Sequence, residues 1–248
     1  MKMINSSIIA IKFLMLVTLA KICVSQDFDF FYFVQQWPGS SCDTKQGCCF
    51  PQTGRPASNF TIHGLWPNYN HGSFPSNCKS VENAFEESKM SDIIPRAEAS
   101  WAALSCPSKK KTNSTNSDNM KLWKHEWEKH GTCSYSVLDQ HAYFDFTLNL
   151  KDHIDLLQIL LNKGIKPDGD KYSVEKIREA IKEATGFEAG IRCNTDASGN
   201  SQLNEIVLCV DKSAASESFI ECPILPDANC PEDVEFPIFG VSQFIDTA

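Results

Sequence analysis

Hydrophobic and polar positions alternate with the period of a β-strand near the start of the chain. Residues 27–37 are rich in aromatic and β-branched side chains, and alternate positions divide them into two faces that are both largely apolar. A strand that is apolar on both faces belongs inside a sheet. The pattern therefore predicts a buried central strand over this segment.

A second, shorter strand is predicted over residues 60–65. Strict alternation would place Thr61, His63 and Leu65 on one face. Gly64 has no side chain, so another group can approach the backbone closely there. We expect Pro67 to end this strand.

Three later segments carry helical periodicity: residues 80–103, 141–161 and 173–184. The first is amphipathic but interrupted at Pro95. The second is predicted as one helix whose apolar stripe includes Leu161. In the third, Ser173 is the expected cap and Gly186 lies just beyond the end.

Strands are predicted again after these helices. Residues 191–194 and 205–210 flank the turn-forming residues 196–200, which indicates a hairpin. Helices and strands do not alternate regularly as βαβ units. The predicted fold class is therefore α+β.

The beginning of the chain has the pattern of a secretory signal over residues 1–25. A basic start leads into an apolar stretch over residues 8–20, broken only by Lys12, and small residues precede Gln26. The stretch is too short for a membrane anchor. Residues 26–248 carry no low-complexity linker, so we expect a single exported domain.

Cysteine content agrees with export. Of the 11 cysteines, Cys23 would leave with the signal, and the even set of ten that remains indicates disulfides in an exported chain. The spacing alone does not fix the pairing. Structural zinc is disfavoured, because Cys48 and Cys49 are adjacent and the chain contains no Cys-x-x-Cys pair.

Charge argues against indiscriminate binding of polyanions. The signal segment holds three of the 23 basic residues and none of the 31 acidic ones, which leaves 20 basic against 31 acidic residues, a balance of −11. A protein of this charge can act on nucleic acid only through a local basic pocket. That behaviour suits an enzyme that releases its product.

The densest chemistry lies in residues 123–133. On a helix, Glu126, Lys129 and His130 would share one face, whereas His125 would lie about 140 degrees from His130. We therefore do not expect the two histidines to hold one metal ion. Four residues separate them, whereas the zinc-protease pattern His-Glu-x-x-His has three.

A second histidine-centred run occupies residues 60–69. Together with residues 123–133 it closely resembles the two active-site segments of the ribonuclease T2 family, and the plant S-like branch in particular. The resemblance extends over about residues 28–239. It implies an α+β fold with a central antiparallel sheet, packed helices and disulfide bonds.

RNA carries its own nucleophile, the 2′-hydroxyl beside each phosphodiester, so the protein need only move protons and stabilise charge on phosphorus. The resemblance implies His130 as general base and His63 as general acid. It also implies that Lys129 and Glu126 stabilise the pentacoordinate phosphorane formed during the reaction, and that His125 holds a phosphate. No metal or cofactor is expected, and the activity should be greatest at acidic to mildly acidic pH.

The resemblance also implies positions for the bases of single-stranded RNA. Trp66, Asn68 and Phe74 match residues that hold the first base, and Gln36 matches one that contacts the second. Many relatives have Tyr at the Phe74 position and Phe at the Leu122 position, so base preference is expected to differ. The implied disulfides are Cys42–Cys48, Cys49–Cys106, Cys78–Cys133, Cys193–Cys230 and Cys209–Cys222.

Two other interpretations of the function remain. The chain could be a ribonuclease-fold storage or defence protein, or a pollen-rejection ribonuclease that acts through partner proteins, although members of that branch tend to be basic. We expect a monomer without an obligate protein partner, secreted or sent to the vacuole, with residues 240–248 as a possible sorting tail. Glycosylation is expected mainly at Asn113, because Asn59 would share the face of His63 if the strand began that early.

Overall fold

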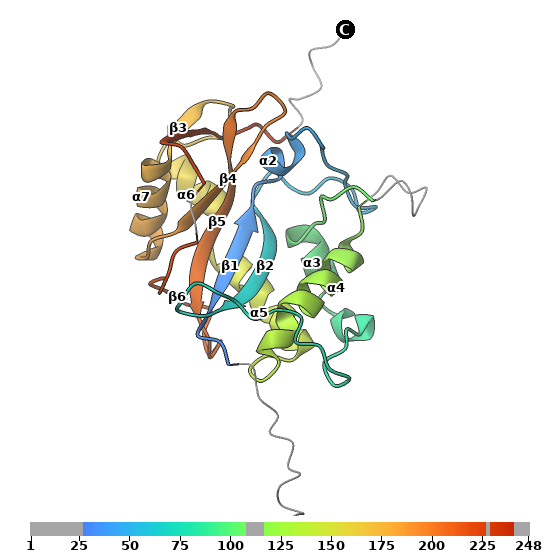
Figure 1. Cartoon of the computed structure of the whole chain (residues 1–248). Coiled ribbons are helices and arrows are strands. Elements are labelled where there is room, and N and C mark those ends of the chain that lie inside the picture. Colours follow the sequence, from blue (N-terminus) through green and yellow to red (C-terminus); the bar gives the residue numbers. More distant parts are fainter. Residues whose placement is uncertain (1–26, 108–116, 227–228, 241–248) are drawn as a thin grey trace, which may run out of the picture.

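The computed structural model describes residues 27–107, 117–226 and 229–240 (Figure 1). The expected signal segment, the Asn113 acceptor site and nearly all of the expected tail lie outside these ranges. The strands are β1 (Phe30–Gln36), β2 (Thr61–Asn68), β3 (Lys171–Ser173), β4 (Gly190–Thr195), β5 (Ser201–Asp211), β6 (Phe219–Ile220) and β7 (Asp233–Glu235). The α-helices are α2 (Pro38–Cys42), α3 (Ile94–Ser100), α4 (Asn119–Lys129), α5 (Gln140–His153), α6 (Leu156–Asn162) and α7 (Val174–Thr185), and the short 3₁₀ helices are η1 (Glu87–Met90) and η2 (Gly131–Ser134).

The sheet has the strand order β2-β1-β5-β7-β3, with β4 and β6 also paired to β5. β1 pairs antiparallel with β2 on one side and β5 on the other, as predicted for a central strand. One contact departs from the expected antiparallel sheet, because β5 and β7 run parallel where Gln202 pairs with Glu235. The sheet is therefore mixed, and the α+β class is confirmed.

The two faces of β1 enter different cores. Phe31 and Phe33 join the main core with the helices, whereas Phe30, Tyr32 and Val34 form a smaller core with the Cys209–Cys222 disulfide. Figure 1 shows α3 and α4 beside the β1–β2 side of the sheet and α7 on the opposite side. Because both faces of β1 are buried, the strand is held firmly in place. Its pairing with β2 sets the position of the residues on that neighbouring strand.

β2 differs from the prediction in two ways. It continues through Pro67 to Asn68, which an edge strand allows because the missing proline N–H faces away from the ladder. The register also shifts, since Val34 pairs with Gly64 but the next residue of β1 pairs with Ile62, which leaves His63 as the extra residue of a β-bulge.

The bulge changes which side chains share a face. Leu65 packs with Ile62 in the main core, so the prediction that Leu65 shares the face of His63 is wrong. The His63 carbonyl accepts a hydrogen bond from Trp101 Nε1 at 2.9 Å, which satisfies a group that the bulge removes from the ladder. The His63 side chain is 33% exposed.

Two helix predictions also need correction. The helix expected over residues 141–161 is two helices, α5 and α6, because Asp155 accepts the Gln158 N–H at 3.1 Å and caps a new helix. Leu161 is partly exposed rather than part of the core stripe. Pro95 does not interrupt a helix but lies in the first turn of α3, where its missing N–H has no cost.

The other predicted elements are confirmed. α7 follows Ser173, which occupies the expected cap position but makes no side-chain capping hydrogen bond, and it ends at Gly186, whose φ of 85° is the left-handed conformation that glycine adopts freely. β4 and β5 form the expected hairpin. All five implied disulfides are present: Cys42–Cys48, Cys49–Cys106, Cys78–Cys133, Cys193–Cys230 and Cys209–Cys222. No helix in the described ranges has the length and apolarity needed to cross a bilayer.

Candidate active site

The two histidine-centred segments lie on opposite walls of one cavity of about 460 Å³. β2 supplies one wall, and α4 with the residue after it supplies the other. The expected site residues on this cavity are His63, Trp66, Asn68, Phe74, Leu122, His125, Glu126, Lys129 and His130. Residues that are separated by about sixty positions in the sequence are thus brought together by the fold.

The two ends of α4 fix where the helix starts and stops, and so fix the positions of its side chains on the cavity wall. Asp118 caps the helix by accepting the Lys121 N–H at 3.1 Å, and the helix ends at Lys129. His130 lies beyond that end with φ −116° and ψ −56°. The His130 N–H still donates to the Glu126 carbonyl at 3.0 Å, so His130 follows the last turn of the helix, and the His125 and His130 rings both border the cavity.

Trp66 occupies the centre of the site. Its Nε1 donates to Glu126 Oε2 at 2.9 Å. Its indole stacks on the His130 ring at 5.1 Å and meets the His63 ring edge-on at 5.0 Å, measured between ring centroids. The tryptophan therefore fixes the positions of both histidines and the carboxyl group relative to one another.

Gly64 makes this arrangement possible. A Cβ at Gly64 would lie inside van der Waals contact of both Trp66 Nε1 and Glu126 Oε2. The expectation that Gly64 permits another group to approach the backbone closely is confirmed. The group that approaches is the Trp66–Glu126 pair.

The environment of His63 favours its protonated form. Burial lowers the pKa of the His63 ring, but the hydrogen bond and charge of Glu205, with the charge of Glu126, outweigh burial and raise that pKa above its ordinary value. The Nδ1 atom of His63 lies 2.5 Å from Glu205 Oε1. A protonated His63 can give a proton to a group in the cavity.

His130 has the opposite environment. Burial, together with the positive charges of Lys129 and His125, lowers the pKa of His130 to about 3. Its Nδ1 is buried and has no hydrogen-bond partner within the described residues. A neutral imidazole on this wall can accept a proton.

Glu126 is almost fully buried between these histidines. Burial raises the pKa of its carboxyl group, and the charge of His63 and the Trp66 N–H only partly offset that effect. Within the described residues, no group of three or more His, Cys, Asp or Glu side chains is arranged to hold a metal ion. The arrangement can move protons and present positive charge from Lys129.

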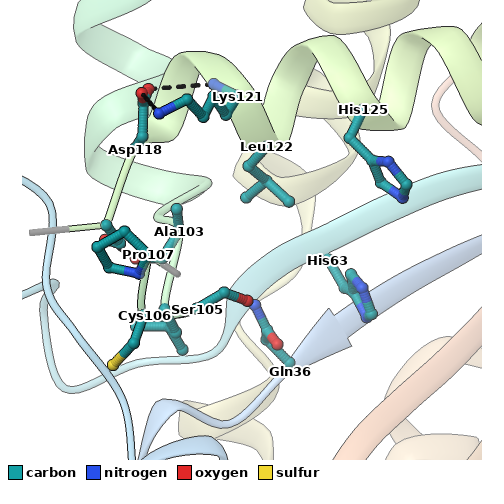
Figure 2. A pocket seen from close by; sticks show the side chains of 12 residues that line it. Gln36, His63, Ala103, Ser105, Cys106, Pro107, Asp118, Lys121, Leu122 and His125 are labelled. Atoms are coloured by element: carbon teal, nitrogen blue, oxygen red, sulfur yellow. Dashed lines mark hydrogen bonds and ion pairs between the residues drawn. The ribbon is translucent and has the colours of Figure 1, made fainter. Parts of the chain in front are cut away.

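A second cavity of about 760 Å³ adjoins the first. Figure 2 shows Gln36 reaching it from the end of β1, with Leu122 and His125 above it on α4 and His63 beside them. Four residues border both cavities: His63, Ser105, Leu122 and His125. The expected base contacts therefore divide into two groups on either side of the histidines, with Trp66, Asn68 and Phe74 in the first cavity and Gln36 in the second.

Sequence reasoning missed several residues of this site. Glu205 and Arg192 contact each other at 3.4 Å beneath His63, and Ser105 lies where the two cavities meet. The sequence did contain a hint of the role of Glu205, because it is an acidic residue at the first position of an otherwise apolar predicted strand. Only the strand register shows that this acid faces a histidine two strands away.

Asn59 lies apart from the cavities. β2 begins at Thr61, so Asn59 precedes the strand and does not share the face of His63. Its side-chain amide donates to Asp155 Oδ1 at 3.2 Å, at the start of α6. The shared face that disfavoured glycosylation at Asn59 is therefore absent from the structure.

The chain is similar to known ribonucleases over most of its length. The model of the Ribonuclease T2 family matches residues 28–222. Extracellular ribonuclease LE of Solanum lycopersicum is 50% identical over 238 residues, covering 95% of this chain and 99% of that protein. Intracellular ribonuclease LX of the same species is 50% identical over 236 residues, covering 94% of each chain.

A solved structure is similar as well. The crystal structure of RNase NT in complex with 5′-AMP superposes with a TM-score of 0.77 and 47% identity, covering 86% of this chain and all of the other. Both the sequence and the architecture are thus shared over most of the molecule. The chain belongs to the ribonuclease T2 family, and it is an RNA-cleaving endoribonuclease.

Proposed function

We propose that the enzyme cleaves single-stranded RNA by transesterification without a metal ion. In this mechanism His130 takes the proton from the 2′-hydroxyl, and the freed 2′-oxygen attacks the neighbouring phosphorus. His63 gives a proton to the 5′-oxygen as its bond to phosphorus breaks. The products are a 2′,3′-cyclic phosphate, which water then opens to a 3′-phosphate, and a 5′-hydroxyl.

One observation carries this assignment of roles. The two histidines border the same cavity, yet the pKa of His63 is raised and that of His130 is lowered to about 3. Paired groups whose pKa values are pushed apart are suited to opposite proton transfers. Both required forms coexist from about pH 3 to above the ordinary histidine pKa of 6.5, in keeping with activity at acidic to mildly acidic pH.

The remaining side chains suit the charge that develops on phosphorus. We assign Lys129 and Glu126 to stabilising the phosphorane, and His125 to holding a phosphate where the two cavities meet. A positive charge and hydrogen-bond donors in a partly buried cavity stabilise such a transition state more strongly than water does. This arrangement needs no cofactor.

The two cavities suit the two bases that flank the broken bond. We propose that Trp66, Asn68 and Phe74 hold one base and that Gln36 and Leu122 contact the other. Phe74 is 55% exposed, so its ring face is available for stacking, which tolerates any base. Leu122 offers an aliphatic surface where an aromatic ring would stack more strongly.

We also propose that residues 1–25 direct export and that residues 26–248 form one domain. The five disulfides support export, because such bonds persist in oxidising compartments. We infer that the exported chain is secreted or delivered to the vacuole; one of the comparison proteins is named extracellular and one intracellular.

Product analysis in the presence of a chelator tests the proposed reaction. We expect a short RNA incubated with purified enzyme and excess EDTA to give fragments with 2′,3′-cyclic phosphate and 5′-hydroxyl ends, at an unchanged rate. Mass spectrometry identifies both ends. Products with 5′-phosphate ends, or activity abolished by EDTA and restored by a divalent metal, would contradict the proposal.

A further inference from the structure

Glu205 is a buried carboxylate that the proposed reaction does not use. It lies on β5, where it pairs in register with Gln36 of β1 and with Arg192 of β4. The residue is 7% exposed. One of its oxygens lies 2.5 Å from His63 Nδ1 and the other lies 3.4 Å from Arg192 Nη1, so both oxygens have partners.

This contact determines which nitrogen of His63 faces the cavity. A histidine whose Nδ1–H donates to a carboxylate presents Nε2 on the opposite side of the ring. Arg192 restrains the carboxylate from below, and its guanidinium lies 5.6 Å from the centre of the Trp66 ring. The chain Arg192–Glu205–His63 therefore links three strands of the sheet to the proton donor.

We propose that Glu205 is a positioning residue that orients His63 and keeps its ring protonated when RNA binds. This inference rests on the proposed role of His63 as general acid. Glu205 itself does not border either cavity, so it acts through the histidine and not on the substrate. It thereby sets the upper pH limit of cleavage.

The other charged groups around His63 do not replace Glu205. Glu126 of α4 also carries a carboxyl group, but burial raises its own pKa, which weakens its negative charge at acidic pH. Arg192 of β4 favours the neutral ring. His125 and Lys129 of α4, and His130 just after it, border the same cavity and add only positive or neutral groups. Burial and Arg192 lower the pKa of His63, whereas Glu205 and Glu126 raise it. If Glu205 is removed, Glu126 alone opposes the two effects that lower this pKa.

The test is the variant Glu205→Gln, which keeps the size and an oxygen acceptor but removes the charge. An opposite charge in close contact typically shifts a pKa by about 1–3 units. We therefore expect the NMR titration of the His63 ring to move down by about one pH unit, and the alkaline limb of the kcat/KM profile to move with it. Above that limb kcat/KM should fall about tenfold, whereas KM and the acidic limb should stay as in the parent, because Glu205 does not touch RNA.

Two further variants complete the experiment. Asp211→Asn removes one exposed charge from the same strand and keeps the acceptor for the Ser213 N–H, so it should leave both the titration and the profile unchanged. Glu205→Asp keeps the charge on a shorter side chain and should give an intermediate alkaline limb. If Glu205→Gln does not fold, the His63 titration in Glu205→Asp decides, and a value equal to that of the parent overturns the proposal.

The two readouts separate this inference from the proposed reaction. An unchanged His63 titration in folded Glu205→Gln would overturn the positioning role. If the titration moves but the alkaline limb does not, the coupling between Glu205 and His63 is upheld. That second result would instead contradict the assignment of His63 as general acid.

Discussion

Replacing either His63 or His130 by alanine is expected to lower kcat/KM for RNA about 10²- to 10⁴-fold, which is the usual contribution of a positioned acid or base. The reason is that each ring performs one of the two proton transfers, and His125, the third imidazole on the cavity, is assigned to phosphate binding. The two variants should also differ in pH dependence. Without His63 the alkaline limb should flatten, and without His130 the acidic limb should flatten.

The control for these variants is His153→Ala. His153 is an exposed histidine at the end of α5, where its Nδ1 contacts the Asn149 carbonyl, and it should retain parental activity. Circular dichroism and the melting temperature would establish that all three variants are folded. Near-parental turnover by folded His63→Ala or His130→Ala would remove the basis of the proposed mechanism.

The variant Gly64→Ala is expected to lose about tenfold to a hundredfold of activity although it adds only one methyl group. The methyl would overlap the Trp66 ring nitrogen and the Glu126 carboxyl, so the pair must separate or the bulge must open. Displacing catalytic groups by about 1 Å can cost on the order of a hundredfold in rate. Overpacking of this kind also destabilises proteins by roughly 1–3 kcal/mol.

Gly240→Ala is the matched control, because a Cβ there meets its nearest neighbour, Ser58 Oγ, at 3.5 Å, an ordinary contact. That variant should keep the parental kcat/KM and melting temperature. Steady-state kinetics on a dinucleotide gives kcat/KM, and thermal unfolding gives the melting temperature. Parental activity in Gly64→Ala would show that the Trp66–Glu126 contact does not organise the site.

The elements that follow local rules could be predicted from the sequence. The central strand was visible because aromatic residues occupy both of its alternating faces, and α7 because Ser173 precedes it and Gly186 follows its end. The histidine-rich segments were visible because titratable side chains are crowded there. In each case the evidence lies within about a dozen residues.

Features that depend on tertiary contacts could not be predicted in this way. Strict alternation placed Leu65 with His63, and only the register against β1 reveals the bulge that separates them. The division of the predicted helix into α5 and α6 depends on Asp155, which caps α6. The apolar pattern continues across this position, so the pattern alone does not reveal the break. The partnership of Glu205 with His63 spans 142 residues and requires three strands to be in register.

In the proposed mechanism the 2′-hydroxyl of RNA is the nucleophile, and the protein supplies only proton transfer and charge. The most direct test is a short RNA with a single 2′-deoxy residue on the 5′ side of one cleaved bond, digested beside the unmodified strand. We expect this bond to survive while the neighbouring bonds are cut at their normal rates. Cleavage at the 2′-deoxy position would mean that the attacking oxygen comes from elsewhere, and it would contradict this mechanism.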